Sequence, residues 1–206
     1  MDERIAGTLA AYDQAAEAYQ EQRRDRRPLD AVRKFAGLAG RGARVLDVAC
    51  GPALDVRVLR DAGLTVVAGD RSHESMRIGK LLFPKGSLAR WDFRNLPFPD
   101  ATFEGVWAHA ALQHLPRVHM RAGLAELRRV QRTGPMFASF REGSGDLDPV
   151  EDPPAGTVYA TSVSADELRA LLLDTGYVDV EVDRRPDLAG GPDIWLYGYG
   201  RLPTSR

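Results

Sequence analysis

The sequence predicts an α/β fold, in which helices cover a mostly parallel sheet. Short apolar runs recur between residues 43 and 140, and segments of helical length separate most of them. An acid, Asp70, stands at the tip of the second run. Strands that alternate with helices form βαβ units, whose strands run parallel and whose crossovers are right-handed. A chain of 206 residues can bury a core of its own, so we expect one domain over 1–206.

The first forty residues are expected to form two helices ahead of the sheet. Apolar and aromatic side chains follow helical spacing over 2–27, which predicts a charged amphipathic helix. Pro28 suits the first position of a second helix, because the missing N–H of proline is not needed there. A glycine cluster after residue 36 then ends this helix.

The central part of the chain alternates between strands and helices. Strands are predicted at 43–48, 65–69, 86–90, 103–108 and 135–140. We expect helices in the three intervals between the first four strands, and a further helix over 117–131 before the fifth.

The last third of the chain begins with a different composition. Residues 142–160 are rich in glycine, proline and acids, which predicts a long loop of the kind that forms lids or binding loops. The pattern from Ser164 to Glu167 is a capping box that opens a helix ending before Gly176. Strands at 177–182 and 193–199 bring the predicted number of strands to seven.

The composition is that of an ordinary globular protein, with 44% hydrophobic and 28% charged residues. The net charge of −1 provides no overall field that would recruit nucleic acid or an anionic membrane. No apolar run approaches the ~20 residues of a membrane span, and the polar start is unlike a signal peptide. The single cysteine cannot form an internal disulfide. We therefore expect a cytoplasmic protein, without a metal site.

The most informative stretch is the first strand and the turn after it, Val45 to Gly51. The strand carries Asp47 and enters a tight turn, and the next strand ends in Asp70. A Rossmann-type sheet holds a nucleoside in this way. The backbone of the turn approaches the ligand, while the carboxylate at the strand tip accepts hydrogen bonds from the ribose hydroxyls.

Together with motifs further along, this stretch resembles the class I S-adenosylmethionine-dependent methyltransferases of the small-molecule branch. The resemblance covers nearly the whole chain. Its motifs are Val45–Asp55, Thr65–Ser72, Trp91–Phe93 with Leu96–Ala108, and Leu112–Pro116 with Leu127–Pro135. It implies a Rossmann-like sheet of seven strands, mostly parallel, flanked by helices, with the last strand antiparallel. It also implies S-adenosyl-L-methionine as the cofactor.

The resemblance assigns roles at the nucleoside end of this cofactor. Asp70 would bind both ribose hydroxyls, and Arg71 follows it in the same motif. Asp92 would accept a hydrogen bond from the adenine amino group, while Phe93 would pack near the ring. A capping acid and a solvated turn acid beside a core phenylalanine are the structural alternatives for these positions.

Further roles are implied at the methionine end. The backbone of Ala49, Cys50 and Gly51 would approach the methionine portion, and the carbonyl of Ala108 would face its ammonium group. Tyr19 resembles a tyrosine that closes over the cofactor, although a core aromatic fits that position as well.

The turn also departs from the family pattern. Alanine stands at positions 49 and 53, where the family has glycine, and alanine disfavours the positive φ angles of such a turn. We therefore expect cofactor binding to persist, with some loss of affinity.

The chemistry of methyl transfer asks mainly for the positioning of a nucleophile and the exclusion of water. A hydroxyl or protonated amine acceptor would also need a general base, and His114, after the fourth strand, is the candidate. His109 has similar access to the acceptor, and we expect His109 and Arg141 to contribute to binding the acceptor. An anionic acceptor needs no base, and Arg141 could orient it. A structural histidine and a surface ion pair remain alternatives.

The sequence thus predicts methyl transfer to an oxygen or nitrogen of a small molecule by a monomer or homodimer. Residues 1–40 would be a helical lid, 41–141 the cofactor-binding core, and 142–206 the substrate side. Two alternatives are a protein that binds the cofactor without transfer and a nucleic-acid methyltransferase. Residues 108–116 contain no acidic-Pro-Pro-aromatic motif, which argues against the second. A nicotinamide dehydrogenase is disfavoured because Ala49–Leu54 contains one glycine.

Overall fold

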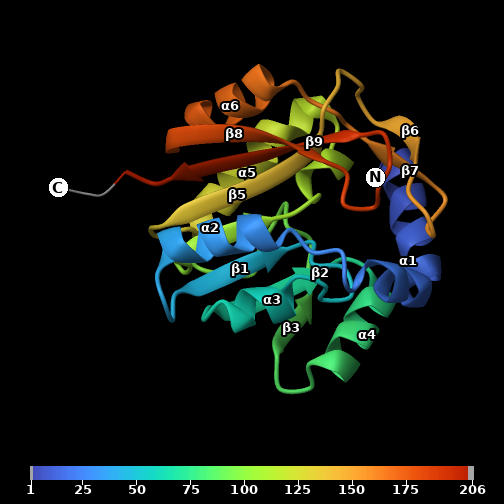
Figure 1. The fold of residues 1–206 in the computed structure, drawn as a ribbon, viewed down its shortest axis with the longest axis horizontal. Helices are drawn as coiled ribbons and strands as arrows, with labels where there is room; N and C mark the ends of the chain where they lie inside the picture. Colours follow the sequence, from blue (N-terminus) through green and yellow to red (C-terminus); the bar gives the residue numbers. More distant parts are fainter. Residues whose placement is uncertain (1, 204–206) are drawn as a thin grey trace.

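A computed structural model describes residues 2–203 and contains a seven-stranded sheet in the order β3-β2-β1-β4-β5-β9-β8 (Figure 1). Its strands are β1 Arg44–Val48, β2 Thr65–Asp70, β3 Ser87–Arg90, β4 Gly105–Ala108, β5 Pro135–Arg141, β8 Val178–Pro186 and β9 Ile194–Arg201. The first five pair in parallel, whereas β9 pairs antiparallel with both β5 and β8. Only β9 therefore runs against the others, which confirms the predicted sheet.

The helices lie on both faces of this sheet. They are α1 Glu3–Arg23, α2 Leu29–Ala39, α3 Val56–Asp61, α4 His73–Leu82, α5 Arg117–Val130 and α6 Ala165–Asp174, with a 3₁₀ turn, η1, over Leu112–His114. Ser164 accepts a hydrogen bond from the backbone N–H of Glu167, so the predicted capping box begins α6. None of the helices within residues 2–203 has the length and apolarity needed to cross a membrane.

Alternate residues of each central strand enter two separate cores, as the period of two requires. Leu46 and Val106 pack with α5 and α6, whereas Val45 and Trp107 pack with α2 and α3. Trp107 is completely buried and stacks on Phe137 of β5, with ring centroids 3.9 Å apart. Because both faces of β1 and β4 are covered, their carboxyl ends are the part of these strands that a ligand can reach.

One predicted helix is not formed. Residues 91–104, between β3 and β4, contain turns and no helix. Pro97 and Pro99 supply no backbone N–H, which prevents a helical hydrogen-bond ladder there. Phe98 instead fills the space by packing edge-on against Trp91 and Phe103.

The segment predicted as a loop, 142–160, contains a β-hairpin. Strands β6 Asp148–Glu151 and β7 Thr157–Ala160 pair antiparallel, apart from the main sheet. Glycine and proline in this segment obscured two very short strands. The hairpin lies beside α1 (Figure 1), and the backbone N–H of Tyr159 donates to Thr8 Oγ1 over 2.9 Å. Two segments far apart in the sequence thus cover one edge of the sheet.

Candidate active site

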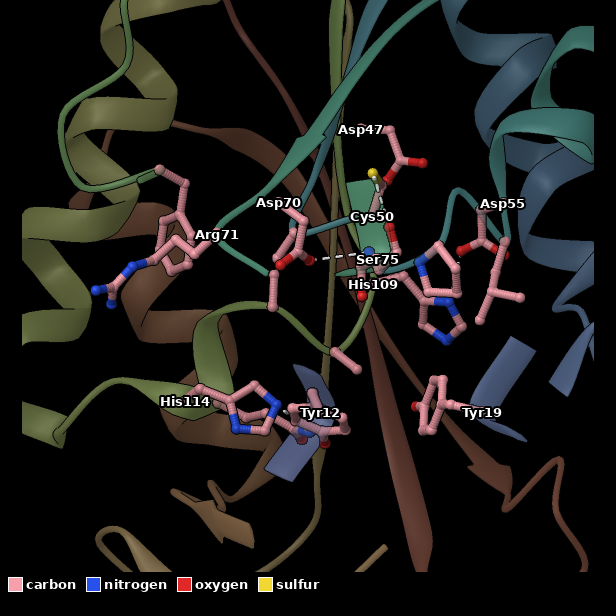
Figure 2. Close-up of a pocket in the computed structure, with 18 of the residues that line it drawn as sticks. Tyr12, Tyr19, Asp47, Cys50, Asp55, Asp70, Arg71, Ser75, His109 and His114 are labelled. Atoms are coloured by element: carbon pink, nitrogen blue, oxygen red, sulfur yellow. Dashed lines mark hydrogen bonds and ion pairs between the residues drawn. The ribbon is translucent and has the colours of Figure 1, made fainter. Parts of the chain in front are cut away.

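A cavity of about 200 Å³ opens at the carboxyl edge of the sheet, where strand order reverses between β1 and β4 (Figure 2). Ligands bind at such switch points in open α/β sheets. Ten of the residues singled out from the sequence line it: Tyr19, Ala49, Cys50, Gly51, Asp70, Arg71, Asp92, Phe93, His109 and His114. Two do not. Ala108 is fully buried at the end of β4, and Arg141 lines a second cavity.

The tip of β2 is fastened to the turn after β1. Asp70 accepts hydrogen bonds from the backbone N–H of Gly51, at 2.9 Å, and of Ser72, at 2.8 Å. A Cβ added at Gly51 would have no heavy atom within 4 Å, so the backbone faces open space there. The carboxylate and the exposed turn backbone are therefore presented to the same cavity.

The two alanines of this turn adopt the conformation that glycine would favour. Ala49 has φ 51° and Ala53 has φ 63°, both in the left-handed region. The turn thus keeps the shape expected of a glycine-rich loop and carries strain of about 1–2 kcal/mol for each such alanine.

We predict that Ala49→Gly raises the free energy of unfolding by about 1 kcal/mol, because glycine has no Cβ to strain at a positive φ. The matched control is Ala18→Gly, at an exposed position within α1. That change should instead lower the free energy of unfolding by about 1 kcal/mol. Urea denaturation measures both, and a loss of stability in Ala49→Gly would contradict the argument.

At the end of β3, Asp92 is engaged with two arginines. It accepts from the backbone N–H of Arg94 at 3.0 Å and from its Nη2 at 2.5 Å, and Arg71 Nε lies 3.5 Å away. Burial raises the pKa of Asp92, but the hydrogen bonds with Arg94 outweigh it and keep that pKa below its usual value. Beside it, the buried Nε1 of Trp91 has no hydrogen-bond partner within the described residues.

Asp47 is 1% exposed, lines the cavity, and has an Oδ2 without a hydrogen-bond partner among residues 2–203. Burial raises the pKa of Asp47 well above its usual value, and the charges of Asp55 and Asp70 raise it further. A buried carboxyl without a partner is costly, so this site favours a ligand that donates a hydrogen bond.

A hydrogen-bond network that the sequence did not reveal centres on Asp55, which precedes α3. Its carboxylate accepts from Trp107 Nε1 at 2.9 Å and from Arg27 at 3.0 Å, and lies 2.7 Å from His109 Nδ1. Burial alone would raise the pKa of Asp55, but its interaction with His109, followed by the charge of Arg27, holds that pKa far below its usual value. Asp55 is therefore ionised in the folded protein.

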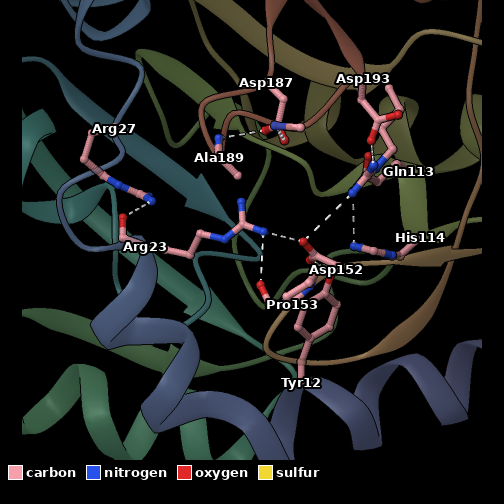
Figure 3. Close-up of polar contacts among 12 residues, drawn as sticks. Tyr12, Arg23, Arg27, Gln113, His114, Asp152, Pro153, Asp187, Ala189 and Asp193 are labelled. Carbon is pink, nitrogen blue, oxygen red and sulfur yellow. Dashed lines mark hydrogen bonds and ion pairs between the residues drawn. The ribbon is translucent and has the colours of Figure 1, made fainter.

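On the opposite wall, α1 and the β6–β7 hairpin are tied together through Asp152 (Figure 3). Its carboxylate accepts from the Tyr12 hydroxyl at 2.8 Å and from Arg23 Nη2 at 2.6 Å. His114 packs edge-on against Tyr12, and its Nδ1 lies 3.0 Å from the carbonyl oxygen of Tyr159. Burial lowers the pKa of His114, so its imidazole is neutral at neutral pH.

Arg141 forms an ion pair with Asp193 and lies 3.9 Å from Asp152. The second cavity, which it lines, shares Arg23 and Asp152 with the first. Arg141 therefore lies in a cavity that adjoins the first one at Arg23 and Asp152.

Known proteins resemble this chain in sequence and in fold. Residues 45–134 match the family described as a methyltransferase domain. Demethylmenaquinone methyltransferase of Renibacterium salmoninarum is 32% identical over 161 residues, which are 68% of this chain and 65% of that protein. Malonyl-[acyl-carrier protein] O-methyltransferase of Enterobacter lignolyticus is 34% identical over 131 residues, which are 63% of this chain and 51% of that protein. The chain spans about half to two thirds of the length of these relatives.

A solved structure supports the fold over nearly the whole chain. The 1,6-didemethyltoxoflavin-N1-methyltransferase of Burkholderia thailandensis superposes with a TM-score of 0.74 over 97% of this chain and 87% of that one, at 20% identity. That structure contains 1,6-didemethyltoxoflavin and S-adenosylhomocysteine.

This chain belongs to the class I S-adenosylmethionine-dependent methyltransferases. Its cofactor is accordingly S-adenosyl-L-methionine. The site of this methyltransferase fits that molecule on three counts: the backbone at Gly51 is open, Asp47 offers an unpaired acceptor, and Trp91 offers an unpaired donor.

Sequence reasoning missed several residues on the walls of the site. Tyr12 reaches it from α1, Arg27 from the segment after α1, and Asp152 from the hairpin. No motif marked these three residues. Asp55 lay inside the first motif, and the only signal for it was its place just after the turn.

Proposed function

We propose that this methyltransferase moves the methyl group of S-adenosyl-L-methionine to an oxygen or nitrogen atom of a small molecule. The observation that carries the proposal is the convergence of the Asp70–Gly51 turn with Tyr19, His109 and His114 on one cavity (Figure 2). When bound, the cofactor supplies an electrophilic methyl group. The protein then has to place the acceptor in line and exclude water.

We assign the cofactor's contacts as follows. The carboxylate of Asp70 accepts from the ribose hydroxyls, and the open backbone of the 49–51 turn follows the methionine portion. Asp92 accepts from the adenine amino group, which has to share that carboxylate with Arg94. The carbonyl of Ala108 and the unpaired carboxyl of Asp47 face the ammonium group.

The N-terminal helix and the 142–160 hairpin form the lid in this proposal. Tyr12, Arg23 and Asp152 hold the two parts of the lid against one another. Because the cavity lies under this lid, a small acceptor suits it better than a nucleic acid. The relatives above are named for different acceptors, which fits a family that varies this part of the site.

Calorimetric titration with S-adenosylhomocysteine tests the proposal first, and transfer of a labelled methyl group from S-adenosylmethionine to a panel of phenols, amines and carboxylates tests it second. We expect saturable binding, transfer to at least one class, and slower hydrogen exchange in residues 3–23 and 148–160 when the ligand is present. Absence of binding would contradict the proposal. Binding without transfer to any acceptor would support a cofactor-binding protein that does not catalyse.

A further inference from the structure

His109 and Asp55 form a carboxylate–imidazole pair in the wall of the cavity. Asp55 Oδ2 lies 2.7 Å from His109 Nδ1 and also accepts from Trp107 Nε1, while Oδ1 accepts from Arg27. The side chain of Asp55 is 5% exposed and that of His109 is 18% exposed. Three donors therefore hold the carboxylate in place, and the carboxylate in turn fixes the imidazole ring.

This pairing determines which nitrogen of His109 carries its proton. Because a carboxylate only accepts, Nδ1 must be the protonated nitrogen, and the lone pair of the neutral ring is on Nε2. Within residues 2–203 the structure gives Nε2 no hydrogen-bond partner. Figure 2 shows this side of the ring turned away from Asp55, toward the open space that Tyr19 and His114 also face.

His114 is less suited to accept a proton. Its Nδ1 is used by the Tyr159 carbonyl, and its Nε2 lies 3.5 Å from the amide nitrogen of Gln113. Nδ1 thus links η1 to the hairpin, while Nε2 faces a neighbouring residue of η1. His73 and His119 are exposed and do not line the cavity.

We propose that His109 Nε2 accepts the proton of the methyl acceptor and that Asp55 positions the imidazole, so that the acceptor is a hydroxyl or protonated amine and not a carboxylate. This inference rests on the proposed function. In the step, the acceptor's oxygen or nitrogen bonds to the methyl carbon as the carbon–sulfur bond breaks, and that electron pair stays on sulfur. The acceptor's proton moves to Nε2, and the imidazolium later releases it to water.

The surroundings of His109 support this role. His109 pairs with Asp55, which in turn pairs with Arg27, and Tyr197 faces the imidazole from β9 with ring centroids 6.3 Å apart. Burial, followed by the charge of Asp55, raises the pKa of Tyr197 to about 12, so this phenol is neutral near pH 7. The rings of Trp107 and Phe137 complete the contact. The carboxylate on one side and the rings on the others hold the imidazole in one orientation.

The test combines a measurement that needs no acceptor with one that does. In protein saturated with S-adenosylhomocysteine, nitrogen NMR should report the Nδ1–H tautomer for His109. With phenol acceptors, His109→Gln should lower kcat about 10²- to 10⁴-fold, the usual contribution of a general base. Its affinity for S-adenosylhomocysteine should stay within about threefold of wild type, and imidazole should restore part of the rate. His73→Gln, an exposed site, is the matched control and should leave kcat unchanged.

Asp55→Asn should change which nitrogen of His109 carries the proton. It should also move the pH range over which the rate rises with increasing pH. This substitution also changes the hydrogen-bond partner of Arg27 and Trp107, so the variant could fail to fold. In that case the tautomer measured for His109 in the wild-type protein tests the inference. An Nε2–H tautomer would overturn the inference, and so would full activity in His109→Gln or a loss of cofactor affinity in that variant at unchanged kcat. Failure of wild type to bind S-adenosylhomocysteine would instead contradict the proposed function.

Discussion

Asp70→Ala is expected to raise the Kd for S-adenosylhomocysteine at least about 100-fold, as loss of two charge-assisted hydrogen bonds implies. The side chain has two functions in the proposed site. It would accept from the ribose, and it already accepts from the backbone of Gly51 and Ser72, so its removal also loosens the turn. Isothermal titration calorimetry measures the change.

The control for this prediction is Asp61→Ala, an acid on α3 whose side chain is 71% exposed. It removes the same charge at a distance from the cavity and should leave the Kd unchanged. If both variants have the same Kd for S-adenosylhomocysteine, the carboxylate of Asp70 does not contact the cofactor. The ribose would then have to bind in another part of the cavity.

Trp107→Ala is expected to lower the free energy of unfolding by about 3–5 kcal/mol, the usual cost of removing a buried indole from a core. Trp107 is fully buried on β4, stacks on Phe137, and donates to Asp55. The variant therefore loses packing and leaves a buried carboxylate with one donor fewer.

Urea denaturation of Trp107→Ala and Trp107→Phe separates these two effects. The phenylalanine variant loses the N–H and part of the indole volume but keeps an aromatic ring that can stack, so it should be the more stable of the two. Equal losses in both variants would mean that the hydrogen bond to Asp55, and not the ring stack, dominates the contribution of Trp107.

The sheet could be predicted because each strand is a short apolar run and each turn has its own composition. The tip acid Asp70 and the turn at Gly51 follow from strand boundaries alone, since parallel strands present their carboxyl ends at one edge. Local patterns also identified the cap at Ser164. The same reasoning failed at 91–104, where prolines removed a helix, and at 142–160, where two short strands pair within a glycine- and proline-rich segment.

The site could be predicted only in part, because its networks join side chains from distant positions. Arg27 lies 28 positions before Asp55, and His109 lies 54 positions after it. Nothing in a single strand or helix indicates that these three meet. Arg141 illustrates the same limit, since the sequence placed it just past a predicted strand with access to the acceptor, whereas it is the last residue of β5 and pairs with Asp193.

The lid joins two segments that lie far apart in the sequence, α1 and the 142–160 hairpin, and this has a consequence for the order of folding during synthesis. Tyr12 and Asp152 are 140 positions apart, and Thr8 and Tyr159 are 151 apart. The turn at Gly51 and the tip of β2 are separated by only 19 positions. Contacts between distant positions wait for the later residues to be made. A nascent chain emerging from the ribosome can therefore form the nucleoside end of the site well before the lid can close over that site.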